Sequence, residues 1–126
     1  MALTVTAASV IASSGASWKF ATASGTITRG QPVSIAADGT VSPANANSAG
    51  TVTLPTVAGI SMSDVGTGQR CYYVESDPSF THGITASEIA PGQAVLLDDT
   101  AGGMTITYSD LDAADWSTVI GQINNP

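Results

Sequence analysis

The chain has 126 residues, of which 10% are charged, and its formal net charge at pH 7 is −7. This length suits a single domain with a buried core. An acidic chain with three basic residues lacks the Lys and Arg clusters that replace counterions on phosphates, so composition argues against binding nucleic acid or an anionic membrane surface. The single cysteine, Cys71, excludes an internal disulfide, and we expect it to be a small buried residue in a strand.

The N-terminal segment, residues 1–16, is predicted to be an arm or an edge strand. From Leu3 to Ala7 apolar residues alternate with threonine, the period of a half-buried strand. The segment has no positively charged start, and polar residues interrupt its apolar ones, so we interpret it as part of the mature protein rather than a signal peptide. We expect such an arm to dock on a neighbouring subunit rather than on its own domain.

Trp18 and Phe20 are the largest apolar side chains of the first third of the chain, and they flank Lys19 in alternation. Two interpretations are open. The first, which we favour, places both aromatic residues in the core. The second makes them anchors in a partner's groove, where buried aromatic residues contribute strongly to binding.

Short strands separated by turn signals follow. Residues 31–35 predict a strand with a proline near its start, where a missing ladder donor is tolerated. Asp38-Gly39 favours a tight hairpin of type I′. Residues 56–62 are mostly apolar and predict a central strand, in which Gly59 indicates a bulge or a close approach of another backbone.

The second half continues the same pattern. In the strand predicted over 70–75, Tyr72 and Tyr73 should point to opposite faces. Residues 90–93 fit a type II turn, with proline second and glycine third. Further strands are predicted at 94–97, 104–108 and 118–123, with one short helix at most over 109–116.

A weak internal repeat relates the two halves at an offset of 62 residues. Gly30-Gln31 falls on Gly92-Gln93, and the Thr-Val-Ala-Gly run that ends at Gly59 falls on the Thr-Val-Ile-Gly run that ends at Gly121. The spacing within each copy is equal, without an insertion. We therefore predict an all-β fold, a compact antiparallel barrel or sandwich built from two related β-units at about 25–62 and 87–124. The arm would be residues 1–16 and the single β-domain residues 17–126.

Candidate catalytic and metal-binding residues are few. His82 is the only histidine, and Cys71 is its only soft partner for a metal, so a zinc site is not indicated. Two acidic clusters, Asp98-Asp99 and the three aspartates of residues 110–115, lack the pattern of a calcium loop and suit solvated turns or helix caps. No phosphate-binding loop or nucleophile motif is present, so we predict no enzyme activity, no catalytic residues, no metal site and no cofactor.

Two stretches carry a family resemblance. Gly30-Gln31-Pro32-Val33 with the Asp38-to-Ala44 hairpin, and Thr56 to Asp64 followed by Gly66 to Gln69, resemble the signature of the small capsid decoration (cement) proteins of tailed phages. The match covers roughly residues 25–123. The match consists of a pattern of small and apolar residues rather than a catalytic motif.

The resemblance implies a compact, β-rich and trimeric structural protein on the outer surface of an icosahedral virion head. Such a protein binds the major capsid protein at junctions between subunits and stabilises the shell. The N-terminal segment would contact the capsid lattice. The expected interface residues are Leu3, Val5, Val10 and Ile11 in the arm, with Trp18 and Phe20 as further anchors.

Two other functions stay open. An adhesive or carbohydrate-binding module of a fibre or cell surface would stack sugars on exposed aromatic residues, with Trp18, Tyr72, Tyr73 and Trp116 as candidates. A small hydrolase would need a pocket around His82 and Cys71.

Overall fold

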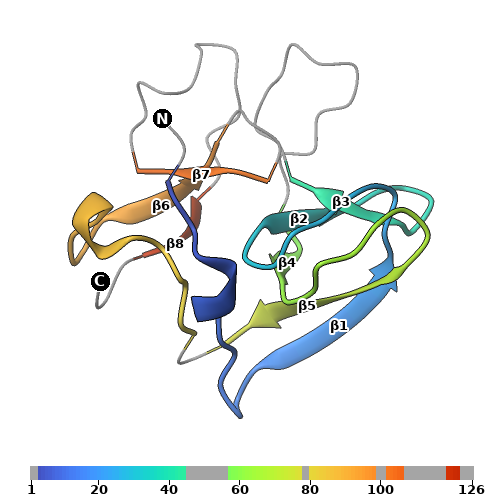
Figure 1. The fold of residues 1–126 in the computed structure, drawn as a ribbon, viewed down its shortest axis with the longest axis horizontal. Helices are drawn as coiled ribbons and strands as arrows, with labels where there is room; N and C mark the ends of the chain where they lie inside the picture. The colour runs from blue at the N-terminus through green and yellow to red at the C-terminus, as the bar shows by residue number, and fades with distance from the viewer. Residues whose placement is uncertain (1–2, 45–56, 78–79, 99–101, 107–118, 123–126) are drawn as a thin grey trace.

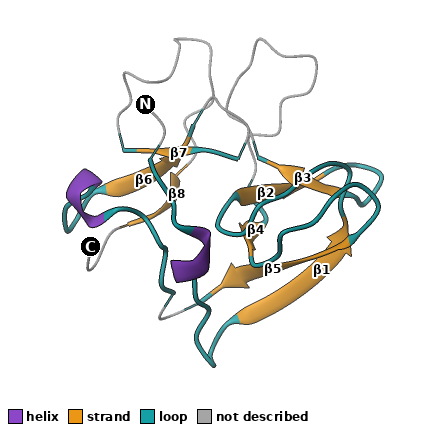
Figure 2. Cartoon of the chain, in the orientation of Figure 1, coloured by secondary structure: helices purple, strands orange, loops and turns teal. Residues whose placement is uncertain are grey.

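Strands make up nearly all of the regular secondary structure that the structure describes, and loops and turns connect them (Figures 1 and 2). The computed structural model describes residues 3–44, 57–77, 80–98, 102–106 and 119–122. Within these residues only two single 3-10 turns are helical, η1 (Ala7–Ser9) and η2 (Ala86–Glu88). The strands are β1 (Ser17–Thr22), β2 (Pro32–Ile35), β3 (Val41–Pro43), β4 (Gly59–Ser61), β5 (Arg70–Ser76), β6 (Ala94–Leu97), β7 (Met104–Thr105) and β8 (Val119–Gln122). The all-β prediction is confirmed, whereas the short helix expected over 109–116 lies outside the described residues.

The strands form two antiparallel sheets rather than a closed barrel. The first has the order β1-β5-β4-β2-β3 and the second the order β7-β6-β8. An isolated bridge between Ala23 and Val41 joins the end of β1 to β3, the opposite edge strand, so the first sheet curls strongly. No further pairing between these two edges is present among the described residues, and the barrel stays open.

The β2–β3 hairpin forms where Asp38-Gly39 predicts it, but with a longer loop than a type I′ turn. The Ala36 N–H donates to the Thr40 carbonyl at 2.8 Å, and Gly39 is the loop residue with positive φ (+85°). A three-residue loop with glycine in the left-handed region is the alternative hairpin, because it needs only one positive φ where type I′ needs two. The Asp38 carboxylate accepts the Thr40 N–H and hydroxyl, which rigidifies the loop.

Each of the three Gly-Gln steps builds the same turn. Gly30, Gly68 and Gly92 have φ of +94°, +83° and +86°, which suits the third position of a type II turn. In each turn the glutamine N–H donates to the carbonyl three residues earlier, at 3.1–3.3 Å. The glutamine side-chain oxygen then accepts the N–H of that same earlier residue, at 2.6–2.9 Å. The type II turn predicted at 90–93 has the expected glycine geometry and hydrogen bond.

The strand register carries the predicted repeat. β2 pairs with β4 through Pro32↔Ile60 and Val33↔Gly59. Moving these pairs along by the 62-residue offset gives Ala94↔Gln122 and Val95↔Gly121, and β6 pairs with β8 in that register. The β2–β3 and β6–β7 pairs, in contrast, differ in register by one residue. Ile35 pairs with Val41, and five residues connect them, whereas six residues connect the equivalent Leu97 to its partner Met104.

The buried apolar residues of the described chain lie in three clusters, one in each sheet and a small third one, Ala44 with Leu97, that joins the end of β3 to β6. The first is Ala23, Ile27, Val33, Val41, Cys71 and Tyr73. The second is Ile84, Ile89, Val95 and Met104. Full burial of one such aliphatic side chain contributes about 1.5–3 kcal/mol, so each cluster is a substantial part of a domain's stability. Gly59 makes the close approach predicted from its position in a strand, since an added Cβ would collide with the Val74 carbonyl oxygen.

The N-terminal segment is not a free arm. It runs between the two sheets (Figure 1) and is fixed to its own chain by isolated bridges, Val5↔Ile84 and Ile11↔Thr81. The Leu3 N–H also donates to the Met104 carbonyl at 2.7 Å. The half-buried strand predicted from the alternation of residues 3–7 does not form, because Val5 makes an isolated bridge and the η1 turn begins at Ala7. The expectation of an extended arm is corrected likewise: the segment finds hydrogen-bond partners within its own domain.

Candidate functional site

Three of the five large apolar side chains that are exposed in the described part of the chain lie on the two-stranded ribbon of β1 and β5. Directly opposite residues share a face of a sheet, and the register pairs Trp18 with Val74, Phe20 with Tyr72 and Thr22 with Arg70. Trp18, Phe20 and Tyr72 are 50%, 57% and 43% exposed. We call this side of the ribbon, with Trp18, Phe20, Arg70 and Tyr72, the aromatic face.

The side chains of the aromatic face contact one another. The Arg70 guanidinium carbon lies 4.6 Å from the centroid of the Phe20 ring, a cation–π contact. The Phe20 and Tyr72 ring centroids are 5.7 Å apart with a tilt of 49°, and the Arg70 Nη1 donates to the Tyr72 hydroxyl at 3.5 Å. Arg70 therefore leans from β5 across onto β1.

The favoured expectation that Trp18 and Phe20 belong to the core is wrong. Alternation along β1 puts the small Ala21 on the core side, where it packs on the buried cluster of the first sheet, and sends the two aromatic residues outward. The strand period predicted that they share a face, but it could not say which face is buried. Tyr72 and Tyr73 do point to opposite faces, since Tyr73 is 5% exposed.

β1 is also an edge strand. It stands first in the order of its sheet, with β5 as its one strand partner, and Figure 1 shows it at the outer margin of the molecule. Its charged residue, Lys19, faces the other side and pairs with Glu75, with Nζ and Oε2 3.3 Å apart. This ion pair is about half exposed, so it contributes little to stability, but it neutralises the lysine charge next to the edge.

The six residues expected at an interface lie in three environments. Val10 is fully buried, and Leu3 and Val5 are half-buried against the cluster of the second sheet. Ile11, in contrast, is 53% exposed, as are Trp18 and Phe20 on β1 to a similar extent. In this conformation the arm residues Leu3, Val5 and Val10 contribute to the fold of their own domain.

Polar side chains hold the N-terminal segment in place at three points. The Glu88 carboxylate accepts the Thr4 N–H and hydroxyl, at 2.7 and 3.1 Å. The Asp77 carboxylate accepts the Ser13 N–H and hydroxyl in the same way. Between them, the Arg29 guanidinium donates twice to the Val10 carbonyl, at 3.0 and 2.5 Å. Charge-assisted hydrogen bonds of this kind are stronger than neutral ones.

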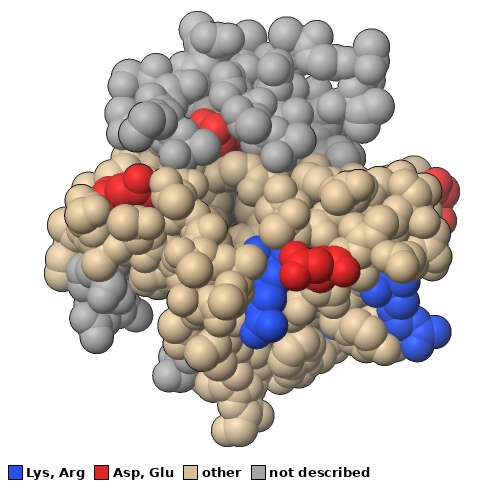
Figure 3. All heavy atoms as spheres, in the orientation of Figure 1, with Lys and Arg blue, Asp and Glu red and all other residues tan. Residues whose placement is uncertain are grey.

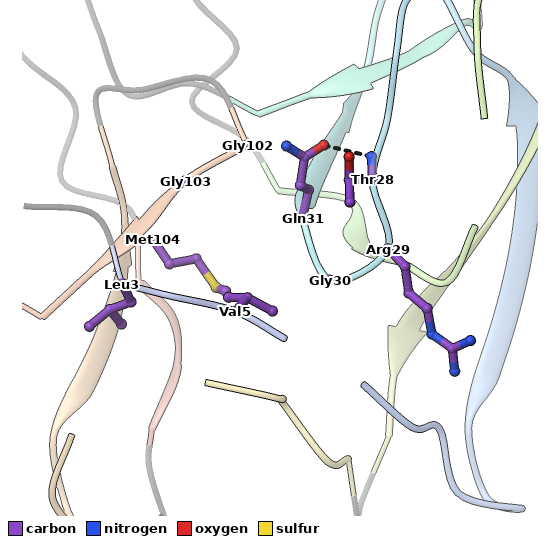
Figure 4. A pocket seen from close by; sticks show the side chains of 9 residues that line it. All are labelled: Leu3, Val5, Thr28, Arg29, Gly30, Gln31, Gly102, Gly103 and Met104. Atoms are coloured by element: carbon purple, nitrogen blue, oxygen red, sulfur yellow. Dashed lines mark hydrogen bonds between the residues drawn. The ribbon is translucent and has the colours of Figure 1, made fainter. Parts of the chain in front are cut away.

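A cavity of about 210 Å³ lies where the N-terminal segment passes between the sheets (Figure 4). Leu3, Val5 and the segment from Gly102 to Met104 lie on one side of it, and the Thr28–Gln31 turn lies on the other (Figure 4). Arg29, the one ionisable residue among those lining it, directs its guanidinium away toward the Val10 carbonyl. The described residues that line the cavity therefore include no Asp, Glu, His, Cys or Lys side chain that could act as an acid or a base.

Cys71 and His82 do not form a reactive pair in this arrangement. Cys71 is fully buried, as predicted, with its sulfur 3.5 Å from the Ser61 hydroxyl. Burial raises the pKa of the Cys71 thiol, which disfavours the nucleophilic thiolate. His82 accepts the Ile84 N–H through Nδ1 at 3.0 Å. Neither residue lines the cavity.

The described residues contain no group of three or more His, Cys, Asp or Glu side chains able to hold a metal ion. Over the same part of the chain, no helix is long and apolar enough to span a membrane. On the face shown in Figure 3, acidic and basic side chains are few and scattered among uncharged atoms. Charge alone thus marks no binding surface on that face.

Comparison of the chain with protein-family models, with curated proteins and with solved structures found no match.

Sequence reasoning missed Arg70 as part of the site and considered Tyr72 only for sugar stacking. Both residues reach the aromatic face through the pairing of β1 with β5, between strands about 50 residues apart in the chain. The signal available in the sequence was alternation: Arg70 and Tyr72 on one strand, and Trp18 and Phe20 on another, each two positions apart.

Proposed function

We propose that this chain is a non-enzymatic structural protein of a virion. In this proposal it is a decoration protein that binds the outer surface of a phage head and stabilises contacts between subunits of the major capsid protein. It acts as an oligomer, expected to be a trimer, without nucleic acid, membrane or cofactor. The aromatic face is its principal capsid-binding surface.

The observation that carries this proposal is the exposure of three large aromatic side chains on one face of an edge ribbon. Exposed apolar groups that cluster, rather than being scattered singly, mark interaction sites. Trp, Tyr and Arg are the residue types that dominate binding energy at protein interfaces. The family resemblance and the low charge of the chain support a protein partner of this kind.

The proposal moves the expected contact from the N-terminal arm to β1. Leu3, Val5 and Val10 are engaged within the domain, so deletion of residues 2–16 would remove part of the fold together with any contact. Exposed Ile11 stays available as a secondary contact. Substitutions at exposed residues are therefore the sharper experiment.

The test is co-sedimentation of the purified chain with empty expanded capsids. The double variant Trp18→Ser with Phe20→Ser should lose binding by at least about tenfold, as expected when interface anchors are truncated. Ile35→Ser is the matched control, because Ile35 is also exposed (41%) but lies on the β2–β3 hairpin. Binding that is unchanged in the double variant, or absent in the native chain, would refute the proposal.

A carbohydrate-binding module is the second candidate, since the same face exposes Trp18 and Tyr72. Three observations count against it. Tyr73 is buried, and Arg70 already covers one side of the Phe20 ring. Phe20 and Tyr72 are tilted by 49°, so they do not form one flat platform for a sugar; Trp116 lies outside the described residues. Glycan-array binding that is lost in Tyr72→Ala would favour this candidate over the capsid.

The hydrolase hypothesis has no support in the geometry, given the buried, neutral Cys71 and a cavity that neither Cys71 nor His82 lines. Loss of a measured hydrolytic activity in His82→Ala would revive it.

A further inference from the structure

We infer that the free edge of β1 accepts an extended strand from the partner chain, and that this strand carries a carboxylate opposite Arg70. The inference deepens the function proposed above by specifying how the aromatic face is engaged. It would place the partner strand as a sixth member of the first sheet, next to β1.

The backbone of β1 supplies the first part of the argument. An edge strand presents unpaired N–H and C=O groups that are a template for another strand, and proteins usually protect such edges with charges, prolines, bulges or short length. β1 has six residues without proline, and its one register shift lies at its first residues, Ser17 and Trp18. The edge is open along β1 and closes just beyond it, where Ala23 bridges to Val41 of β3. The one charge of β1, Lys19, is neutralised by Glu75. The usual protections are therefore weak.

The aromatic face supplies the second part. A strand added beside β1 would lie about 4.8 Å away, and its outward side chains would stand next to those of Trp18 and Phe20. These rings are half-exposed and would be covered by apolar residues at alternate positions of the incoming strand. Backbone hydrogen bonds would provide affinity, and the aromatic side chains would provide selectivity.

Charge identifies the chemistry of the occupant. Arg70 carries the only formal charge on the aromatic face, and its guanidinium contacts the ring of Phe20 on β1 as well as the hydroxyl of Tyr72 on β5. Because Phe20 belongs to the edge strand, a side chain of the next strand that lies beside Phe20 would stand close to this guanidinium. In the described part of the chain its recorded contacts are the Phe20 ring and the Tyr72 hydroxyl, neither of which is an anion. An aspartate or glutamate on the incoming strand would complete a charge-assisted pair.

The test uses end-capped peptides of about seven residues, the length of a strand. One places valine, valine and aspartate at successive alternate positions, so that all three side chains share the face of Trp18, Phe20 and Arg70, with threonine at the positions between them. A second has lysine in place of aspartate, and a third is the aspartate peptide N-methylated at every backbone amide, which blocks both of its edges. The probe measurement is titration by calorimetry, with amide hydrogen exchange of β1 as the structural readout. The native chain should bind the aspartate peptide at least about tenfold more tightly than the lysine peptide. The N-methylated peptide should not bind, because it cannot pair with a strand edge.

Variants test the two contributions separately. Arg70→Gln should weaken the aspartate peptide about tenfold and reduce the preference over lysine, and Trp18→Ser should weaken both peptides. Contact with the aromatic face alone would not slow hydrogen exchange of the β1 amides. Slowed exchange in the complex would therefore identify backbone pairing. Absence of binding, equal binding of the N-methylated peptide, or no effect of Arg70→Gln would overturn the inference. Concentration-dependent dimerisation through β1 would also overturn it, by identifying a second copy as the occupant.

The same experiments distinguish this inference from the proposed function. If capsids bind the aromatic face but no peptide does, the strand-addition mode fails and the function stands. If the peptide binds and capsids do not, β1 does accept an added strand, and its partner is a protein other than the capsid.

Discussion

The β3-β2-β4 and β7-β6-β8 groups share a strand order, and their β2–β4 and β6–β8 pairs share a register, but the two groups are used differently. In the first sheet β4 is flanked by β5 and β1, which carry the aromatic face. In the second sheet β8 is the last strand, and the N-terminal segment packs on the cluster of that sheet. The repeated unit therefore supplies a scaffold, and the elements added to it distinguish a surface offered to a partner from one covered by the chain itself.

The substitution with the largest expected effect tests the side of β4 that pairs with β5. Gly59→Ala should lower the free energy of unfolding by about 3 kcal/mol or more, because the new Cβ would collide with the Val74 backbone and nothing flexible can yield. The equivalent Gly121→Ala in β8 should cost less, since no described strand pairs with β8 on that side. Urea unfolding measures both. Gly25→Ala, with no atom within 4 Å of the added Cβ, is the control. Equal losses of unfolding free energy at Gly59 and Gly121 would contradict the prediction that β8 is less closely packed than β4.

The next effect tests how firmly the N-terminal segment belongs to its own domain. Val10→Ala should cost about 2 kcal/mol, because it removes fully buried apolar atoms, whereas Ile11→Ala should cost about 0.5 kcal/mol or less. Adjacent residues thus act as a matched pair in thermal or chemical unfolding. Similar small costs at both positions would mean that the segment is not docked in solution, and the arm would again become the candidate for capsid contact.

A smaller effect compares the Gly-Gln turns of the two units. Gln31→Ala and Gln93→Ala each remove one side-chain hydrogen bond to a backbone N–H, worth about 1 kcal/mol. Gln31 should cost more, since its side chain also packs against Gly102, whose added Cβ would meet it within 3 Å. Denaturant unfolding measures the difference, and Gln69→Ala provides the third member of the series. A larger cost at Gln93 would contradict the asymmetry.

The smallest effect concerns the β2–β3 hairpin. Hydrogen bonds from the Thr40 hydroxyl, and then the Thr40 N–H, lower the pKa of Asp38 below its usual value of 3.8. A pKa that is depressed in the folded state contributes stability that is present above the unfolded value and lost as pH falls through the folded one. NMR titration of the Asp38 carboxyl should show this depression in the native chain. It should be reduced in Thr40→Val, where only the backbone donor remains; an unchanged pKa would assign the shift to another cause.

The amino-acid sequence determined the local structure because its signals act over a few residues. Gly-Gln steps specify turns, Asp38-Gly39 specifies a hairpin, and alternation specifies strands. The all-β class and the 62-residue offset between the two units could therefore be predicted from the amino-acid sequence, and the β2–β4 and β6–β8 pairs match that offset. The buried state of Cys71 and the close approach at Gly59 were predictable for the same reason. The exact loop at Asp38-Gly39 was not, since both hairpin types use the same residues.

Only the tertiary structure decided which surfaces are free. Alternation in β1 shows that Trp18 and Phe20 share a face, but whether that face is buried depends on what packs against the ribbon. The N-terminal segment is apolar enough for either its own domain or a partner, and the carboxylates of Asp77 and Glu88 that hold it are more than 60 positions away in the chain. Non-local contacts of this kind have no local signature, because many residue pairs satisfy the same hydrogen-bonding and burial requirements and only the assembled fold selects among them.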